Sequence, residues 1–161
     1  MRKYLLDTSV LIAAKKKHYG MDFCPAFWEW LVSANRSNIV NSVEAVYDEL
    51  ATGSDELSDW ANERGEAFFL QADDATLKSM KRISHWVVSQ NYTQSAVADF
   101  LAVADYALVA CAHAHKFTVV THEIRTNQTT KVKIPNVCEA FQVEVTDPFA
   151  MLRAEKARFV L

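Results

Sequence analysis

The sequence predicts an α/β fold with three layers, α/β/α, around a mostly parallel central sheet of four to five strands. Short apolar runs with strand-like residues alternate with longer segments of helical periodicity along the 161 residues. Strands separated by helices are joined by crossovers, which make neighbouring strands parallel and cover both faces of the sheet. Only three glycines and three prolines interrupt these segments, as is typical of a compact domain.

Length and composition indicate one domain spanning residues 1–161. Half of the residues are hydrophobic, and a chain of this length can bury most of its apolar surface. The net charge of −3 does not indicate nucleic-acid binding, so a nucleic-acid enzyme would need a local basic patch beside an acidic site. The cysteines form no C-x-x-C pair, and we see no secretory signal or membrane-spanning apolar run. We therefore expect a cytoplasmic protein without a membrane partner.

The first half of the chain predicts three strands and four helices. The strands are short apolar runs, expected at residues 4–7, 38–41 and 68–70. Helical spacing of apolar residues predicts helices at residues 10–17, 26–32, 43–51 and 57–64.

The second half predicts a long helix over residues 73–90, followed by helical composition over residues 96–115. That second segment is either one helix or two helices that meet near Asp105. A β-branched run predicts a strand at 118–121, and residues 143–145 are the expected last strand. Asp147 followed by Pro148 is typical of an N-cap with proline in the first turn, so a C-terminal helix is expected from there.

Acidic residues follow two of the predicted strands. Asp7 ends the first strand, and a buried strand rarely carries a charge that lacks a partner. Glu123 follows the strand at 118–121. Parallel neighbours would bring both strand ends to one edge of the sheet, where open α/β folds bind ligands. The alternatives are a helix N-cap at Asp7 and an exposed loop glutamate at Glu123.

Two further acids lie at the borders of apolar helices. Glu49 lies at the edge of an apolar stripe, so it either points into a cleft beside the sheet or is solvated. Asp105 opens a strongly apolar helix, whose burial would place this acid at the edge of the sheet. A first-turn acid favoured by the helix dipole is the alternative. Asp99 is a rival in the same segment, one helix face away.

These motifs resemble the PIN-domain family, to which the VapC-type toxin ribonucleases belong. The resemblance rests on Leu5-Leu6-Asp7-Thr8-Ser9-Val10-Leu11, Val46-Tyr47-Asp48-Glu49-Leu50, Ala104-Asp105-Tyr106-Ala107-Leu108-Val109-Ala110 and Val119-Val120-Thr121-His122-Glu123. Residues 133–138 and 151–161 resemble a less characterised branch of PIN-like proteins. The chain departs from the family at two points. Glu123 stands where an aspartate is usual, and Tyr106 is a bulky neighbour of Asp105.

The resemblance implies a Mg²⁺- or Mn²⁺-dependent endoribonuclease that hydrolyses RNA phosphodiester bonds, leaving a 5′-phosphate and a 3′-hydroxyl. It implies that one or two cations are held by four acids: Asp7, Glu49, Asp105 and Glu123. Carboxylate oxygens are the hard ligands that these cations prefer. Asp7 and Asp105 are the expected primary ligands, whereas Glu49 and Glu123 act directly or through water. Three hydroxyls, Thr8, Ser9 and Thr121, are expected to orient the carboxylates or the phosphate.

A polyanionic substrate also needs cations near the acids. The expected phosphate contacts are Lys15, Lys16, Lys17, Lys131 and Lys133, and RNA binding through them should weaken steeply with salt. Lysines 15–17 alternatively complement the C-terminus of a helix. Asn136 is either a polar site residue or, with Glu139 three positions on, part of a helix capping box, which is the preferred interpretation.

The resemblance also implies partners: a cognate antitoxin protein, with the chain itself as the toxin of a toxin–antitoxin pair, and a homodimer. A second class of function is a catalytically inactive PIN-like module that binds protein or RNA, which a Glu123 pointing away from the other acids would favour. A third is a phosphatase with an aspartyl nucleophile. That chemistry normally has a second aspartate two residues after the first, where this chain has Ser9.

Overall fold

The structure is a computed structural model that describes residues 1–161. Its strands form one sheet in the order β3-β2-β1-β4-β5, and every neighbouring pair is parallel. The strands are β1 (Tyr4–Leu6), β2 (Val40–Val43), β3 (Phe69–Leu70), β4 (Thr118–Val120) and β5 (Val145–Thr146). The predicted parallel sheet and α/β class are therefore confirmed.

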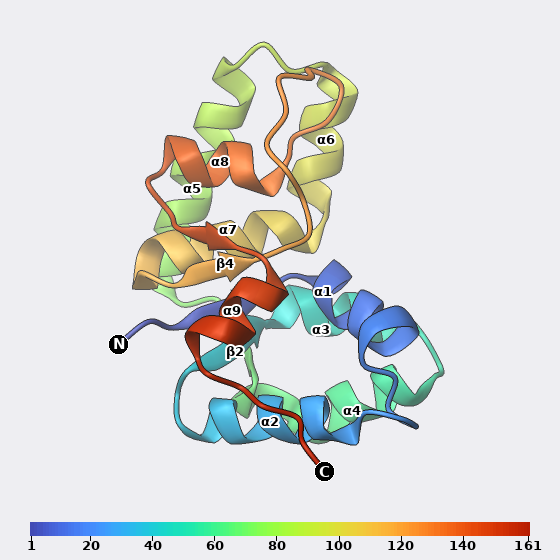
Figure 1. The fold of residues 1–161 in the computed structure, drawn as a ribbon. Coiled ribbons are helices and arrows are strands. Elements are labelled where there is room, and N and C mark those ends of the chain that lie inside the picture. The colour runs from blue at the N-terminus through green and yellow to red at the C-terminus, as the bar shows by residue number, and fades with distance from the viewer.

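Helices cover the sheet from two sides. They are α1 (Thr8–Ala13), α2 (Pro25–Arg36), α3 (Glu44–Ala51), α4 (Glu56–Arg64), α5 (Asp74–Ser89), α6 (Gln94–Ala102), α7 (Ala104–His115), α8 (Ile134–Ala140) and α9 (Pro148–Ala154). A π-helical turn, η1 (Ala14–His18), extends α1, and a 3₁₀ turn, η2 (Gly65–Ala67), follows α4. In Figure 1, α2 and α4 lie below the sheet while α5, α6, α7 and α8 lie above it.

The order of the strands reverses at β1. The chain runs from β1 to β2 on one side, and β4 later pairs with β1 on the other side. Leu6 is in register with Val120, and the amide of Asp7 donates to the Val120 carbonyl at 3.0 Å. The residues that follow these two strands are therefore neighbours. In open α/β sheets, the crevice at such a reversal is where ligands bind.

Strand β1 and the middle of helix α7 form the centre of the hydrophobic core. All three residues of β1 have no exposed surface, since both faces of the sheet are covered. Helix α7 packs between the sheet and α5, and its residues Leu108–Ala112 are all buried. No single helix is long and apolar enough to cross a membrane. Helices α6 and α7 meet that criterion only when taken together, and they are bent by 70° at their junction.

Element boundaries differ from the prediction where the backbone turns. Strand β2 begins two residues later than expected, because Asn38 adopts a positive φ of 59° and the Ile39 amide still bonds back to Ala34. The helical segment at 96–115 is two helices, which break at the extended residue Val103 just ahead of Asp105.

Smaller shifts occur at both ends of the chain. The helix expected at 10–17 begins at Thr8 and becomes a π-turn from Ala14. The last strand is Val145–Thr146 rather than 143–145. The predicted N-cap is confirmed, because the Asp147 carboxylate accepts a hydrogen bond from the amide of Ala150 at 2.8 Å.

The capping box predicted for Asn136 and Glu139 is wrong. Helix α8 begins at Ile134, and its N-cap Lys133 makes no side-chain cap bond. The Asn136 side chain instead bonds to the backbone of Thr126, in the segment before the helix. A pattern that spans four residues cannot reveal this partner, because Thr126 lies ten residues before Asn136 in the chain.

Candidate functional site

All four predicted acids line one pocket at the carboxyl ends of β1 and β4. The pocket has a volume of about 490 Å³. Asp7 follows β1, Glu49 comes from α3, Asp105 lies in the first turn of α7, and Glu123 follows β4. Four segments that are remote in the sequence therefore converge on the crevice where the strand order reverses.

Asp7 is a buried carboxylate held by two hydroxyls. Its side chain is only 4% exposed, and its Oδ2 accepts hydrogen bonds from Ser9 Oγ at 2.7 Å and Thr121 Oγ1 at 2.9 Å. Asp7 stands at the N-cap position of α1, but its side chain makes no cap bond there, so the carboxylate does not serve as a helix cap. Because both hydroxyls bind the same oxygen, Oδ1 is left for another ligand. Ser9 and Thr121 lie where the predicted orienting role requires them.

Glu49 joins three elements around the pocket. Its Oε1 accepts a hydrogen bond from Thr8 Oγ1 at 2.7 Å, and its Oε2 accepts one from the backbone amide of Ala104 at 3.0 Å. Helix α7 has no side-chain cap of its own, since its N-cap residue is Val103. Glu49 therefore satisfies an amide that would otherwise lack a partner at the start of α7. Glu49 is an exposed residue, and these two hydrogen bonds anchor its carboxylate at the pocket.

Asp105 carries the strongest electrostatic effect in the pocket. Burial is the largest cause and the negative charges of Asp7, Glu123 and Glu49 add to it; together they raise the pKa of Asp105 from the usual 3.8 to about 7, while Lys131 acts in the opposite direction. Such a shift arises when like charges share a site with little water. The pocket is therefore a place where negative charge is crowded.

Glu123 is held at one oxygen only. Its Oε1 accepts a hydrogen bond from the amide of Ile134 at 3.4 Å, and its own amide donates to Thr121 Oγ1 at 3.1 Å. Its Oε2 is buried and has no hydrogen-bond partner. Burial raises the pKa of Glu123; the bond from Ile134 lowers it, and the charge of Asp7 raises it. A buried carboxylate oxygen without a donor is costly, and a bound cation would satisfy it.

The chemistry of these donors fits a hard divalent cation. The pocket offers carboxylate oxygens from four acids, and cation binding would relieve their mutual repulsion. No three His, Cys, Asp or Glu side chains are close enough together to form a complete metal site as they lie. The fit therefore rests on the donor type, the unpartnered Oε2 of Glu123 and the raised pKa of Asp105.

The predicted phosphate-binding lysines are not equivalent in the structure. Lys131 lines the pocket, and both it and Lys133 lower the pKa of Glu123. Lys15 is not free, because its Nζ bonds to the Asp55 carboxylate at 3.0 Å. Lys16 and Lys17 are exposed on η1, outside the residues that line the pocket.

Asp99, which the sequence offered only as a rival to Asp105, lines the pocket together with Asp105. It lies on α6 and reaches the exposed rim of the pocket. The prediction placed it one helix face away from Asp105, as a straight helix would. The break at Val103 bends α6 from α7 by 70° and turns Asp99 toward the same pocket. No local signal in the sequence specifies the angle of that bend.

Comparison with solved structures shows what this arrangement is similar to. The crystal structure of VapBC2 from Rickettsia felis bound to a DNA fragment from their promoter matches with a TM-score of 0.54 and 12% identity. The match covers 89% of this chain and 97% of that chain. The likeness confirms the PIN-like fold that the motifs predicted.

No curated protein matches the chain. A family model does match, over residues 4–159, and the chain therefore belongs to the family described as a domain of unknown function, DUF4411.

Proposed function

We propose that this chain is a divalent-metal-dependent endoribonuclease. One observation carries the proposal: Asp7, Glu49, Asp105 and Glu123 line a single pocket where the strand order reverses. Such a pocket repels a phosphodiester unless its charge is neutralised. When bound, Mg²⁺ or Mn²⁺ supplies that neutralisation, activates water and stabilises charge that develops on the phosphate.

The residues around the acids orient the carboxylates before any ligand arrives. Ser9 and Thr121 hold one oxygen of Asp7, and Thr8 holds one oxygen of Glu49. Hydrogen bonds of this kind fix the direction in which a carboxylate presents its free oxygen. These contacts support the orienting roles proposed for the three hydroxyls.

A substrate phosphate would meet positive charge at one side of the pocket. Lys131 lies at the pocket itself, whereas Lys16 and Lys17 are exposed on η1 and would contact only RNA that extends beyond the pocket. RNA as the substrate follows from the resemblance to PIN-domain ribonucleases. The toxin role and an antitoxin partner are inferred from the likeness to VapBC2, which was solved as a complex on promoter DNA.

The decisive experiment is cleavage of labelled RNA in Mg²⁺ or Mn²⁺ compared with chelator. We expect Asp7→Asn and Asp105→Asn each to lower cleavage by roughly a thousandfold or more, since each removes a charged oxygen from the metal site. Asp48→Asn is the matched control, because Asp48 is exposed on the same helix as Glu49 but does not line the pocket. Cutting in chelator, or full activity in both variants, would overturn the proposal.

The second candidate is a PIN-like module that binds RNA or protein without catalysis. The lack of any ready-made group of three metal ligands favours it. RNA binding without cleavage in either metal would support this candidate.

The toxin role has its own test. Expression of the chain in a bacterial host should arrest growth, and Asp7→Asn should abolish the arrest.

A further inference from the structure

We propose that Asn136 is a positioning residue for Glu123, because its side chain fixes the loop that carries this acid. The inference builds on the proposed function, since it assigns a residue to the same pocket. We call residues 121–133, between β4 and α8, the pocket loop. Asn136 does not line the pocket and would act only through this loop.

The pocket loop contains no helix or strand of its own. Its ends are anchored, by β4 on one side and by the buried Val132 and Ile134 on the other. Between them, Ile124 is 80% exposed, so the segment beside Glu123 has little apolar packing. A loop with few buried contacts opens easily unless polar contacts restrain it. The position of the Glu123 carboxylate therefore depends on such contacts.

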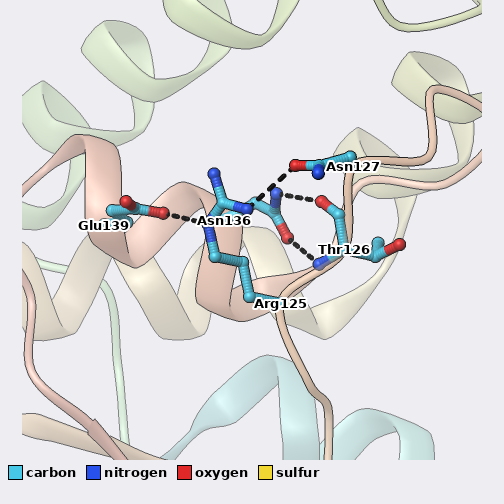
Figure 2. Close-up of polar contacts among 5 residues, drawn as sticks. All are labelled: Arg125, Thr126, Asn127, Asn136 and Glu139. Carbon is cyan, nitrogen blue, oxygen red and sulfur yellow. Dashed lines mark hydrogen bonds and ion pairs between the residues drawn. The ribbon is translucent and has the colours of Figure 1, made fainter.

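Asn136 supplies a two-sided contact, which Figure 2 shows. Its Oδ1 accepts a hydrogen bond from the amide of Thr126 at 3.2 Å, and its Nδ2 donates to the carbonyl of Thr126 at 2.6 Å. One side chain thus pairs both backbone groups of a loop residue, as a neighbouring strand would. No other side chain satisfies a loop residue on both sides in this way.

The same part of α8 also binds the acid itself. The amide of Ile134 donates to Glu123 Oε1, two residues before Asn136 in that helix. Two points on the loop, Glu123 and Thr126, are therefore held against two points on one turn of α8. Two attachments three residues apart fix the orientation of the segment as well as its position. We infer that this pair of contacts holds the Glu123 carboxylate at the wall of the pocket.

A neighbouring contact provides a natural control. Arg125 bonds to the Glu139 carboxylate and, through Nη1, to Asn127 Oδ1 at 2.9 Å. The side chains of Arg125 and Glu139 are 53% and 61% exposed. Exposed ion pairs contribute little to stability because water and salt screen them. Glu139→Gln therefore alters the same helix and the same loop without removing the contact to Thr126.

The first test measures amide hydrogen exchange of the loop in metal-free protein. We expect Asn136→Ala to speed exchange at Thr126 and its neighbours by about tenfold, as loss of a partly buried hydrogen-bonding side chain should. Asn136→Asp keeps the acceptor but not the donor and should fall in between, which covers the case in which the alanine variant folds poorly. Glu139→Gln should stay within about twofold of the parent. Unchanged exchange in Asn136→Ala would overturn the proposal.

The second test asks whether the contact serves Glu123. Mn²⁺ binding is measured without RNA for Asn136→Ala, Glu123→Gln and the double variant. We expect about tenfold weaker binding in each single variant and no further loss in the double variant, because both changes remove the same ligand. Additive losses would show that Asn136 acts elsewhere and would overturn the positioning role. A parent that neither binds Mn²⁺ nor cuts RNA refutes the proposed function, while hydrogen exchange still decides whether Asn136 holds the loop.

Discussion

The two glutamates of the pocket are held in different ways. We call helix α3 at Glu49 the Glu49 wall, and the pocket loop at Glu123 the Glu123 wall. Glu49 projects from helix α3, and both of its oxygens accept hydrogen bonds, from Thr8 and from the amide of Ala104. Glu123 projects from the pocket loop, and its Oε2 has no partner. The comparison teaches that the first wall is preorganised by regular elements, whereas the second depends on a few polar contacts from α8. We expect the Glu49 wall to be rigid and the Glu123 wall to adjust when a cation binds.

The largest expected effect concerns Asp105, whose pKa is raised in part by the negative charges of Glu49 and Glu123 on the two walls. Its pKa is raised from 3.8 to about 7 in the folded protein, so folding takes up a proton between these values. Stability should therefore fall as pH rises from about 4 to 7 and then level off, with a total loss of at most about 4 kcal/mol. The measurement is urea unfolding in chelator at pH 5 and pH 8.

Two additions sharpen that pH experiment. Asp105→Asn should remove most of the fall in stability, because the side chain then carries no charge at either pH. Mn²⁺ should restore stability to the parent at pH 8, since a ligand that binds only the folded state stabilises it by mass action. Stability of the metal-free parent that is independent of pH would contradict the crowding of charge described above.

The next largest effect is expected when the hydrogen bonds of Glu49 are removed from the Glu49 wall. Glu49→Ala removes the acceptor for the Ala104 amide at the start of α7 and should cost about 1.5 kcal/mol of unfolding free energy. Glu49→Gln keeps an acceptor oxygen and should cost well under 1 kcal/mol, roughly half of the alanine effect or less. Both variants should lose RNA cleavage because both lose the charge. Equal unfolding energies for the two variants, measured in urea, would show that Glu49 does not cap α7.

A smaller effect is expected at Thr121, which links Asp7 to the Glu123 wall. Thr121 Oγ1 donates to Asp7 and accepts from the amide of Glu123, and Thr121→Val removes both bonds while keeping the shape. We expect about 1 kcal/mol lower stability and roughly tenfold slower cleavage. Thr118→Val is the matched control, because Thr118 is a buried residue at the other end of β4. If both variants cleave equally slowly, the effect is general to the strand and the orienting role is wrong.

The smallest effect concerns the positive charge on the Glu123 wall. Lys131→Met should weaken RNA binding about threefold and reduce the salt slope by about 0.7, the value for one phosphate contact on a single strand. Binding is measured in the Asp7→Asn background, so that no substrate is cut. Lys116→Met is the control, since Lys116 precedes β4 at the opposite edge of the sheet. An unchanged salt slope for Lys131→Met would remove this lysine from the RNA-binding surface.

The sequence by itself determined the fold class, and it indicated the four acids of the pocket through the resemblance of their motifs to the PIN-domain family. Strand and helix signals depend on local periodicity and residue type, so they can be read without coordinates. An acid directly after an apolar strand, as at Asp7 and Glu123, is also a local signal. Its position at the carboxyl edge follows from the parallel sheet, which the alternation of strands and helices predicted.

Only the tertiary structure decided how those acids are held. The bonds from Glu49 to the start of α7 and from Asn136 to Thr126 join residues whose pairing depends on how the helices pack. The bend at Val103, which brings Asp99 to the rim of the pocket, is likewise set by packing of α6 and α7. Hydrogen bonds between distant segments form only where burial brings their partners together, and no local pattern specifies that geometry.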